Sequence, residues 1–120
     1  MAIGGRAGRG APPVTVMFVY ATAGDAAEAQ SIGRAVVGER LAACANVLAG
    51  MRSIYWWEGA VQEAAEAVLI LKTTTERLGA LIARVRELHS YACPCIEALP
   101  VADGNPAFLA WIARETGGGG

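Results

Sequence analysis

Three aromatic residues beside a predicted chain reversal limit how this chain can fold more than any other feature. Tyr55-Trp56-Trp57 end one strand-like run, and Glu58-Gly59 separate it from a second. Each large aromatic side chain buries roughly 150–250 Å² when it packs, so leaving three of them in water is costly. A small domain must cover such a hairpin tip, and a second copy of the chain is the simplest cover. We therefore predict a self-associating antiparallel β-ribbon with Tyr55, Trp56 and Trp57 in the subunit interface.

The alternation of side chains along a strand adds a second expectation for this hairpin. Trp56 and Trp57 point to opposite faces of a regular strand, so one is expected in the subunit core and the other against a partner. Arg52 and Glu63 are placed to pair across the same hairpin, which is an ordinary surface contact.

The composition also favours self-association. The chain has 120 residues, the size of one domain. Its hydrophobic content is 54% and its charged fraction 18%, whereas soluble domains average about 45–50% and about 25%. A surface this apolar favours an oligomer over a monomer. The formal net charge of −1 provides no overall field that would attract nucleic acid or an anionic membrane, so neither is an expected partner.

The ends of the chain and its cysteines predict the domain limits and the compartment. Residues 1–13 contain no apolar stretch, so we expect a flexible arm rather than a secretory leader. Residues 14–116 form the expected domain, and 117–120 are expected to be a flexible glycine tail. No apolar run reaches the ~18 residues of a membrane span. The three cysteines are an odd number without secretory context, which predicts reduced thiols in the cytoplasm.

Hydrophobic periodicity and turn residues predict four strands and three helices in the order β-α-β-β-α-β-α. The strands are expected at 14–21, 42–57 with a bulge at Ala49-Gly50, 65–73 and 95–101. The helices are expected after Asp25, after Thr73-Thr74-Thr75 and after Asn105, with these residues as caps and Glu28 completing a capping box. This order predicts an α+β ferredoxin-like sandwich with a long antiparallel β-hairpin.

Apolar residues at helical spacing define the expected buried face of each helix. They are Ile32, Val36, Val37 and Leu41 in the first, Leu78, Leu81, Ile82, Val85 and Leu88 in the second, and Phe108, Leu109 and Ile112 in the third.

Several stretches follow the sequence patterns of one known family. They are Tyr20–Thr22, Glu39–Val47, Ser53–Gly59, Leu71–Thr73, His89–Pro94 and Phe108–Ile112. Together they span roughly 14–115 in the family's order and spacing, and on them the chain resembles the CutA family of divalent-cation tolerance proteins. The resemblance implies a ferredoxin-like subunit, a homotrimer joined through long β-hairpins, and a cytoplasmic role linked to copper and other divalent metals.

No catalytic activity is implied by the resemblance. The sequence itself contains no Ser/His/Asp set, phosphate-binding loop or zinc-protease helix, so a non-enzymatic protein is expected.

One segment departs from the family pattern. The family usually reads His-Pro-Tyr-Glu-x-Pro-Glu before the last strand, whereas residues 89–95 here read HSYACPC. Both glutamates are missing, and Cys93 and Cys95 have appeared. Soft thiolate ligands favour Cu(I) or zinc over magnesium, calcium or manganese. Copper or zinc is therefore the metal that this departure predicts.

The thiols and a histidine are the candidate metal ligands. In an extended segment Cys93 and Cys95 lie on one face, roughly 6–7 Å apart, and modest side-chain rotation lets both sulfurs approach one ion. His89 is a candidate third ligand, and Cys44 a fourth if a trimer brings it to another subunit's thiols. The alternative stays open that the cysteines only fill space and that His89 is a cation complementing a helix C-terminus.

Two further functions stay open. Lys72 ends a strand next to a helix N-terminus, where it is placed to hold an anion such as phosphate or carboxylate, or to form a salt bridge with a neighbouring subunit's glutamate. Together with Arg52, His89 and Tyr91 it is a candidate for a nucleotide- or anion-binding cleft between subunits, by analogy with the trimeric PII signalling proteins. A purely structural trimer that presents another protein by its N-terminal arm is the other candidate.

Overall fold

The computed structural model describes residues 15–117, and over this range it contains the predicted elements in the predicted order. They are β1 (Val16–Ala23), α2 (Ala26–Gly38), β2 (Cys44–Trp57), β3 (Ala60–Thr74), α3 (Thr75–Leu88), β4 (Ile96–Pro100) and α4 (Pro106–Glu115). The predicted arm at 1–13, and all of the predicted tail except Gly117, lie outside the described residues. No helix in the described range is long and apolar enough to cross a membrane.

The four strands form one antiparallel sheet in the order β2-β3-β1-β4. β1 lies in the interior and pairs with both β3 and β4, while β2 and β3 form the long hairpin. The hairpin register shifts between Leu48 and Met51, and Gly50 has a φ of 78° there. Only glycine adopts this left-handed conformation without a steric cost. The bulge is therefore where the sequence predicted it, and the topology is the predicted ferredoxin-like one.

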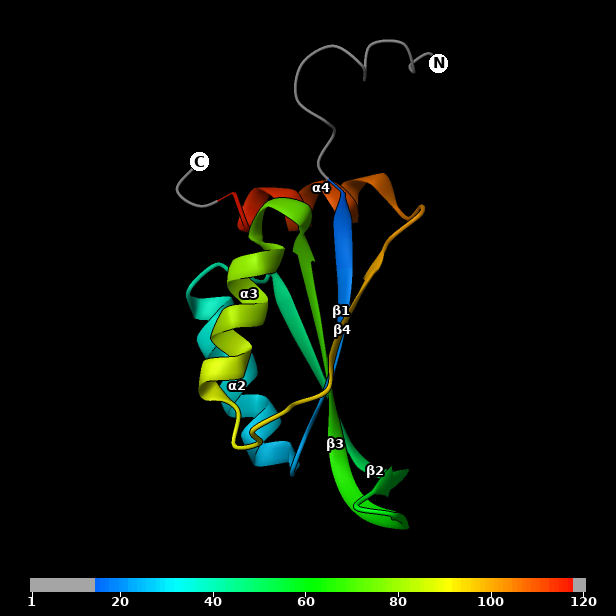
Figure 1. Cartoon of the computed structure of the whole chain (residues 1–120). Helices are drawn as coiled ribbons and strands as arrows, with labels where there is room; N and C mark the ends of the chain where they lie inside the picture. Colours follow the sequence, from blue (N-terminus) through cyan, green and yellow to red (C-terminus); the bar gives the residue numbers. More distant parts are fainter. Residues whose placement is uncertain (1–14, 118–120) are drawn as a thin grey trace.

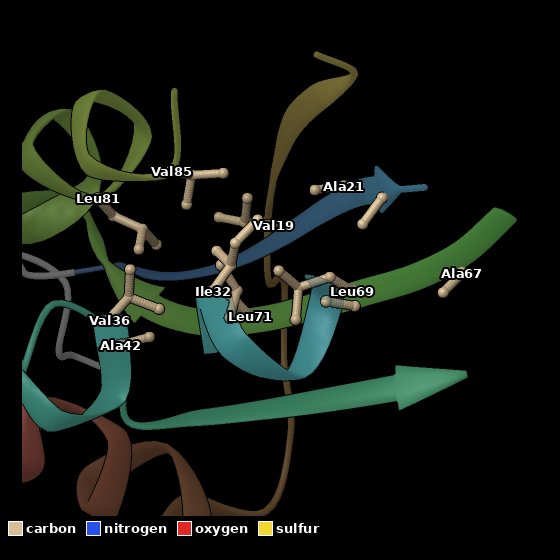
Figure 2. Close-up of a cluster of buried hydrophobic side chains, with 12 residues drawn as sticks. Val19, Ala21, Ile32, Val36, Ala42, Ala67, Leu69, Leu71, Leu81 and Val85 are labelled. Atoms are coloured by element: carbon tan, nitrogen blue, oxygen red, sulfur yellow. The ribbon is translucent and has the colours of Figure 1, made fainter. Parts of the chain in front are cut away.

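Helices α2 and α3 lie side by side against one face of the sheet (Figure 1). The strands contribute Val19, Leu69 and Leu71 to this layer, and the helices contribute Ile32 and Leu81, all at most 2% exposed. Figure 2 shows these side chains converging between the helices and the strands. Burial of a side chain of this size stabilises a fold by about 1.5–3 kcal/mol relative to exposure. This layer is the main core of the subunit.

The opposite face of the sheet, which we call the open face, is covered within the described residues at one end only. The strand registers place Phe18, Leu48 and Leu99 on it. Leu48 and Leu99 are 55% and 56% exposed. Helix α4 covers the end of this face around Val16 and Ile112. Large apolar side chains on the rest of the open face are therefore left in contact with solvent.

The β2–β3 hairpin extends well beyond the helix layer (Figure 1). It turns through Glu58 and Gly59, whose φ values of 51° and 81° are the positive pair of a tight two-residue hairpin turn. The extension raises the radius of gyration to 16.3 Å, against about 13 Å for a globular chain of this size. β3 accordingly begins at Ala60 rather than at the predicted 65, because the polar residues before 65 also pair with β2.

One expectation for the hairpin tip was wrong. Trp56 and Trp57 do point to opposite faces, but they are 74% and 58% exposed, so neither enters the subunit core. The reason is that the hairpin extends beyond α2 and α3, and no helix of the described range lies over either of its faces there.

The predicted helix caps hold at two of the three helices. Asp25 Oδ1 accepts a hydrogen bond from the Glu28 amide at 2.8 Å, and Asn105 Oδ1 accepts one from the Ala107 amide at 3.1 Å. Thr74 occupies the N-cap position of α3, but its side chain makes no capping hydrogen bond. It is only 2% exposed and is buried with the core instead. The threonine caps predicted for α3 are therefore not formed.

Gly33 lies where α2 approaches the sheet most closely, and its replacement gives a test of this packing. A Cβ atom at Gly33 would meet the Ala45 Cβ at 3.0 Å and Leu69 Cδ1 at 3.5 Å. Ala45 cannot rotate away because its Cβ is fixed to the backbone of β2. We expect Gly33→Ala to lower the free energy of unfolding by about 1–2 kcal/mol, the usual cost of overpacking, in spite of alanine's better helix propensity.

Gly79→Ala is the matched control, because Gly79 lies in α3 with nothing within 4 Å of the added Cβ. It should stabilise the protein by about 0.5–1 kcal/mol. Urea denaturation at one protein concentration measures both variants. Equal stabilisation by the two substitutions would contradict the close helix–sheet contact.

Candidate functional site

A group of polar side chains lies where the hairpin leaves the helix layer, and we call it the base cluster. It joins α2, β3, β4 and the loop 89–95 that follows α3. Its members are Glu28, Glu66, His89, Tyr91, Cys95 and Glu97.

His89 anchors the loop rather than offering a ligand. Its side chain is 1% exposed, and Nε2 lies 2.7 Å from the Thr22 carbonyl oxygen. A carbonyl oxygen only accepts, so Nε2 carries the proton and donates it. Nδ1 accepts a hydrogen bond from the Tyr91 amide at 3.0 Å. Both nitrogens of a neutral ring are thus used, so the roles predicted for His89, as a metal ligand and as a helix-end cation, are not supported.

Glu28 holds the start of the same loop. Its Oε1 accepts from the Gly24 amide at 3.0 Å and its Oε2 from the Ser90 amide at 2.8 Å, while Oε2 also lies 3.7 Å from His89 Nδ1. Partial burial alone would raise the pKa of Glu28, but the hydrogen bonds from Ser90 and Gly24 outweigh it and lower the pKa. The carboxylate therefore links α2, the end of β1 and the loop.

Tyr91 ties the loop to the hairpin. Its hydroxyl donates to Glu66 Oε2 at 2.8 Å, and its ring lies against His89 with a centroid distance of 4.7 Å. The other Glu66 oxygen accepts from the Ser53 hydroxyl on β2. The hydrogen bond to Glu66, with burial and nearby negative charge, raises the pKa of Tyr91 to about 12. The phenol is accordingly a firm donor at neutral pH.

Cys95 and Glu97 form the part of the cluster that is open to solvent. The Cys95 thiol donates to Glu97 Oε1 at 3.7 Å, and both residues are exposed. Burial raises the pKa of the Cys95 thiol, and the charge and hydrogen bond of Glu97 raise it further, with Glu66 adding to the effect. The thiol is therefore protonated at neutral pH unless a cation takes the place of its proton.

The spacing of these two donors fits a metal ion. Sulfur and oxygen donors bound to one tetrahedral ion, at about 2.3 Å and about 2.0–2.2 Å, lie roughly 3.6 Å apart. The Cys95–Glu97 separation of 3.7 Å is close to this value. Within residues 15–117, however, no three His, Cys, Asp or Glu side chains come close enough together to hold one ion. The subunit thus offers part of a donor set, which a further ligand must complete.

The four predicted metal ligands are not brought together in the subunit. Cys93 is exposed on the same loop as Cys95, whereas Cys44 begins β2 and is half-buried. Cys44 lies on the edge strand β2, opposite Lys72 of β3. Cys95 comes directly before β4, which is the other edge strand. Three strand spacings and about four residues along the strands separate the two, which amounts to roughly 20 Å. Cys44 cannot share an ion with Cys95 of its own subunit.

The residues predicted for an anion cleft also lie apart. Arg52 pairs with Glu63 across the hairpin at 3.3 Å, as expected, and Tyr91 binds Glu66. Lys72 donates to Asn46 Oδ1 at 2.7 Å at the other end of the sheet. No single subunit therefore assembles a nucleotide cleft from these three side chains.

The carboxylates of the base cluster were missed as functional residues. Glu28 was identified from the sequence only as part of a capping box, and Glu66 and Glu97 were not singled out. A signal was present for Glu97, which follows Cys95 at the two-residue spacing that places both on one strand face. None was present for Glu66, because only the fold of β3 against the loop brings it to Tyr91.

Comparison with known proteins supports one assignment. Residues 17–115 match the profile of the family described as CutA1 divalent ion tolerance protein. Over 89 residues the chain is 48% identical to the divalent-cation tolerance protein CutA of Thermus thermophilus, covering 74% of this chain and 86% of that one. It is 39% identical over 103 residues to the chloroplastic protein CutA 1 of rice, covering 86% of this chain and 58% of the longer rice protein.

A solved structure has the same fold. The crystal structure of CutA from Xylella fastidiosa superposes with a TM-score of 0.83 at 37% identity, covering 85% of this chain and 98% of that one.

Replacement of Glu28 tests the anchoring of the loop. Glu28→Gln leaves one of two backbone amides without an acceptor, and we expect it to lower the free energy of unfolding by about 1–2 kcal/mol at pH 7. A lowered carboxyl pKa contributes stability above the unfolded value, and this contribution is lost as the pH falls through the folded pKa. The difference between wild type and variant should therefore shrink below about pH 4.5.

Glu87→Gln is the control for Glu28→Gln, since Glu87 is 67% exposed and pairs only with Arg84 on the helix surface. Urea denaturation at pH 7 and at pH 3.5 measures both variants. A penalty for Glu28→Gln that does not depend on pH would rule out the role of its charge.

The bond between Tyr91 and Glu66 has its own test. Glu66→Gln removes the charge that holds the phenol proton, so the pKa of Tyr91 should fall from about 12 towards 10. ¹³C NMR of labelled tyrosine side chains follows the titration of the three tyrosines, and Tyr91→Phe identifies the signal of Tyr91. An unchanged titration in Glu66→Gln would mean that another group sets this pKa.

Proposed function

Since the chain belongs to the CutA1 divalent ion tolerance protein family, we propose that it acts in metal tolerance as a homotrimer that binds copper or zinc. The family is not an enzyme family. The proposed ligands are Cys95 and Glu97, which lie together in the subunit, and Cys93, which has to move towards them or come from a neighbouring subunit, because no three such side chains lie close together within residues 15–117. The observation that carries the proposal is the exposed Cys95 thiol held against the Glu97 carboxylate at 3.7 Å.

The electrostatics of the base cluster favour a cation at this point. Burial raises the pKa of the Cys95 thiol most, and Glu97 and Glu66 raise it further because a thiolate there would face negative charge. A bound cation reverses this effect, since it neutralises both the thiolate and the carboxylates around it. Binding then releases the thiol proton, so metal affinity should rise with pH through the neutral range.

The identity of the donors indicates which ions bind. Two thiols and one carboxylate form a mixed, mainly soft set, which suits Cu(I) and zinc better than magnesium or calcium. In the family pattern the two glutamates correspond to Ala92 and Cys95, and the variable position between them corresponds to Cys93, so a soft ligand replaces a hard one at position 95 and a second thiol stands two residues before it. The chain is accordingly adapted to thiophilic ions.

The trimer is part of the same proposal. The open face exposes Leu48 and Leu99, and the hairpin tip exposes Tyr55, Trp56 and Trp57. Both edge strands of the sheet, β2 and β4, have a free side within the described residues. Exposed edges and apolar surface are removed together when copies of the chain pack in a closed ring. A neighbouring subunit then lies close enough to the base cluster to supply the missing ligand.

We also propose a reducing compartment, the cytoplasm, as the site of action. All three cysteines are unpaired, and a thiolate site works only while it is reduced. The chloroplast name of the rice relative belongs to that protein, and cell fractionation with thiol labelling tests the location of this one.

Metal titration of thiol variants tests the function. Anaerobic titration of the reduced protein with Cu(I), against a competing chelator, should show tight binding that Cys95→Ser weakens by more than tenfold. This size of effect is expected because loss of a group that merely supports a metal ligand already lowers metal affinity by about 10–100-fold. Glu97→Gln should weaken binding less than Cys95→Ser does.

Cys44→Ser identifies the source of the missing ligand, because Cys44 is also a free thiol but lies on the far edge of its own subunit's sheet. It should bind Cu(I) like the wild type if Cys93 completes the site, and more weakly if Cys44 of a neighbouring subunit does. Equal and weak binding by wild type and by the double variant Cys93→Ser/Cys95→Ser would refute the thiolate site.

A further inference from the structure

A cavity of about 220 Å³ lies beside α4, at the end of the open face away from the hairpin. Its walls come from β1, β3, α4 and the turn before α4. The apolar lining consists of Val16, Phe18, Val101, Phe108, Leu109 and Ile112. The remaining lining residues are Lys72, Asp103, Gly104 and Asn105. The cavity is therefore mostly apolar, with one cation in its wall.

Lys72, the only lysine of the chain, is held in this wall by two contacts. Its Nζ donates to Asn46 Oδ1 at 2.7 Å and lies 5.9 Å from the centre of the Phe108 ring. No carboxylate within the described residues comes within salt-bridge distance of it. An ammonium group has three N–H donors, and Asn46 accepts from one of them. Lys72 is thus a positioned, half-buried cation without an anionic partner among residues 15–117.

The same contacts explain why Phe108 is 42% exposed although the sequence predicted it in the buried face of α4. Its ring forms a wall of the cavity and faces the Lys72 ammonium rather than the core.

Asp103 is the only acidic residue in the lining, and it does not neutralise Lys72. Its Oδ1 accepts a hydrogen bond from the Gly104 amide at 2.8 Å, and the residue is exposed in the turn before α4. The negative charge is therefore at the mouth, while the positive charge is in the wall. This arrangement orients an anion with its charged end towards Lys72 and away from Asp103.

We propose that this cavity binds a small apolar carboxylate, with its carboxylate on Lys72 Nζ and its apolar body between Phe18 and Phe108. The size of the cavity limits the ligand, because an apolar cavity of about 150 Å³ holds benzene. A volume of 220 Å³ leaves room for one ring or a branched chain that carries a carboxylate.

The proposal does not depend on the metal site. Lys72 pairs with Phe18 in the sheet, whereas Cys95 lies beyond the pair Ala21–Ile96, at the level of Thr22. Four residues of strand separate the two levels, about 13 Å. Cys95→Ser should leave carboxylate binding unchanged, and Lys72→Met should leave Cu(I) binding unchanged, so failure of one proposal is distinguishable from failure of the other.

Benzoate is the probe for the experiment. Protein labelled with ¹³C-lysine gives one side-chain signal from the single lysine, and its shift reports binding at Lys72 directly. Titration with sodium benzoate, against sodium chloride at the same ionic strength, should shift this signal with a dissociation constant of about 1 mM, as expected for so small a ligand. Neutral benzyl alcohol should shift it at least tenfold more weakly.

Three variants complete the test, with benzoate binding followed by ligand-observed NMR. Lys72→Met keeps the length of the side chain without its charge and should weaken benzoate binding at least tenfold. Asp103→Asn removes the like charge at the mouth and should tighten it. Gly104→Val places side-chain atoms towards Leu109, 3.3 Å from the Cβ position, and should weaken binding while Lys72 is retained.

Equal binding of benzoate and benzyl alcohol, equal binding by wild type and Lys72→Met, or no shift of the lysine signal at 20 mM benzoate would each overturn the proposal. The last result is also the one expected if a neighbouring subunit fills the cavity.

Discussion

The sheet of this protein carries apolar side chains on both faces, but within the described residues helices cover one face along its length and the other at one end only. Val19, Leu69 and Leu71 point into the layer formed by α2 and α3, while Leu48 and Leu99 point from the same sheet into solvent. The hairpin enlarges this imbalance, since it carries its tryptophans beyond the end of both helices. Most of what distinguishes the molecule follows from this unequal covering, and it is the reason for proposing that further copies of the chain cover the rest.

The base cluster lies on the border between the covered and the uncovered parts. Glu28, His89 and Tyr91 use their hydrogen-bonding groups to fix the loop 89–95 to α2, β1 and β3. Within the described residues no buried side-chain nitrogen or oxygen lacks a partner. The loop is thus positioned by satisfied groups, and the thiols that it carries are left exposed. Structural anchoring and the proposed metal binding therefore use different side chains of one short segment.

Much of the fold could be predicted from local sequence. The strand and helix order, the bulge before Met51, the Asp25 and Asn105 caps and the Glu58-Gly59 turn all depend on neighbouring residues, and all are present. The exposure of Trp56 and Trp57 was not predictable in this way, because it depends on how far the hairpin outruns the helices.

The candidate site was less predictable than the fold, since its contacts join distant parts of the chain. His89 was considered as a ligand because its residue type permits it, yet the Thr22 carbonyl, 67 positions away, uses its donor. Glu66 reaches Tyr91 only after β3 and the loop are folded. Lys72 was expected to meet an anion or a neighbouring subunit's glutamate, which stays a prediction, and its contacts with Asn46 and the Phe108 ring inside the subunit were not foreseen. The thiols were found from sequence because they depart from a known pattern.

The central claim is that a trimer of this chain binds soft metal ions through Cys95 and its neighbours. Native mass spectrometry of reduced protein, treated with Cu(I) and desalted, measures assembly and metal content at once. The account predicts a complex of about three times the 12.4-kDa chain mass that retains copper, and a Cys95→Ser complex of the same size without it. A monomer, a copper-free trimer of the wild type, or equal copper in the variant would contradict it.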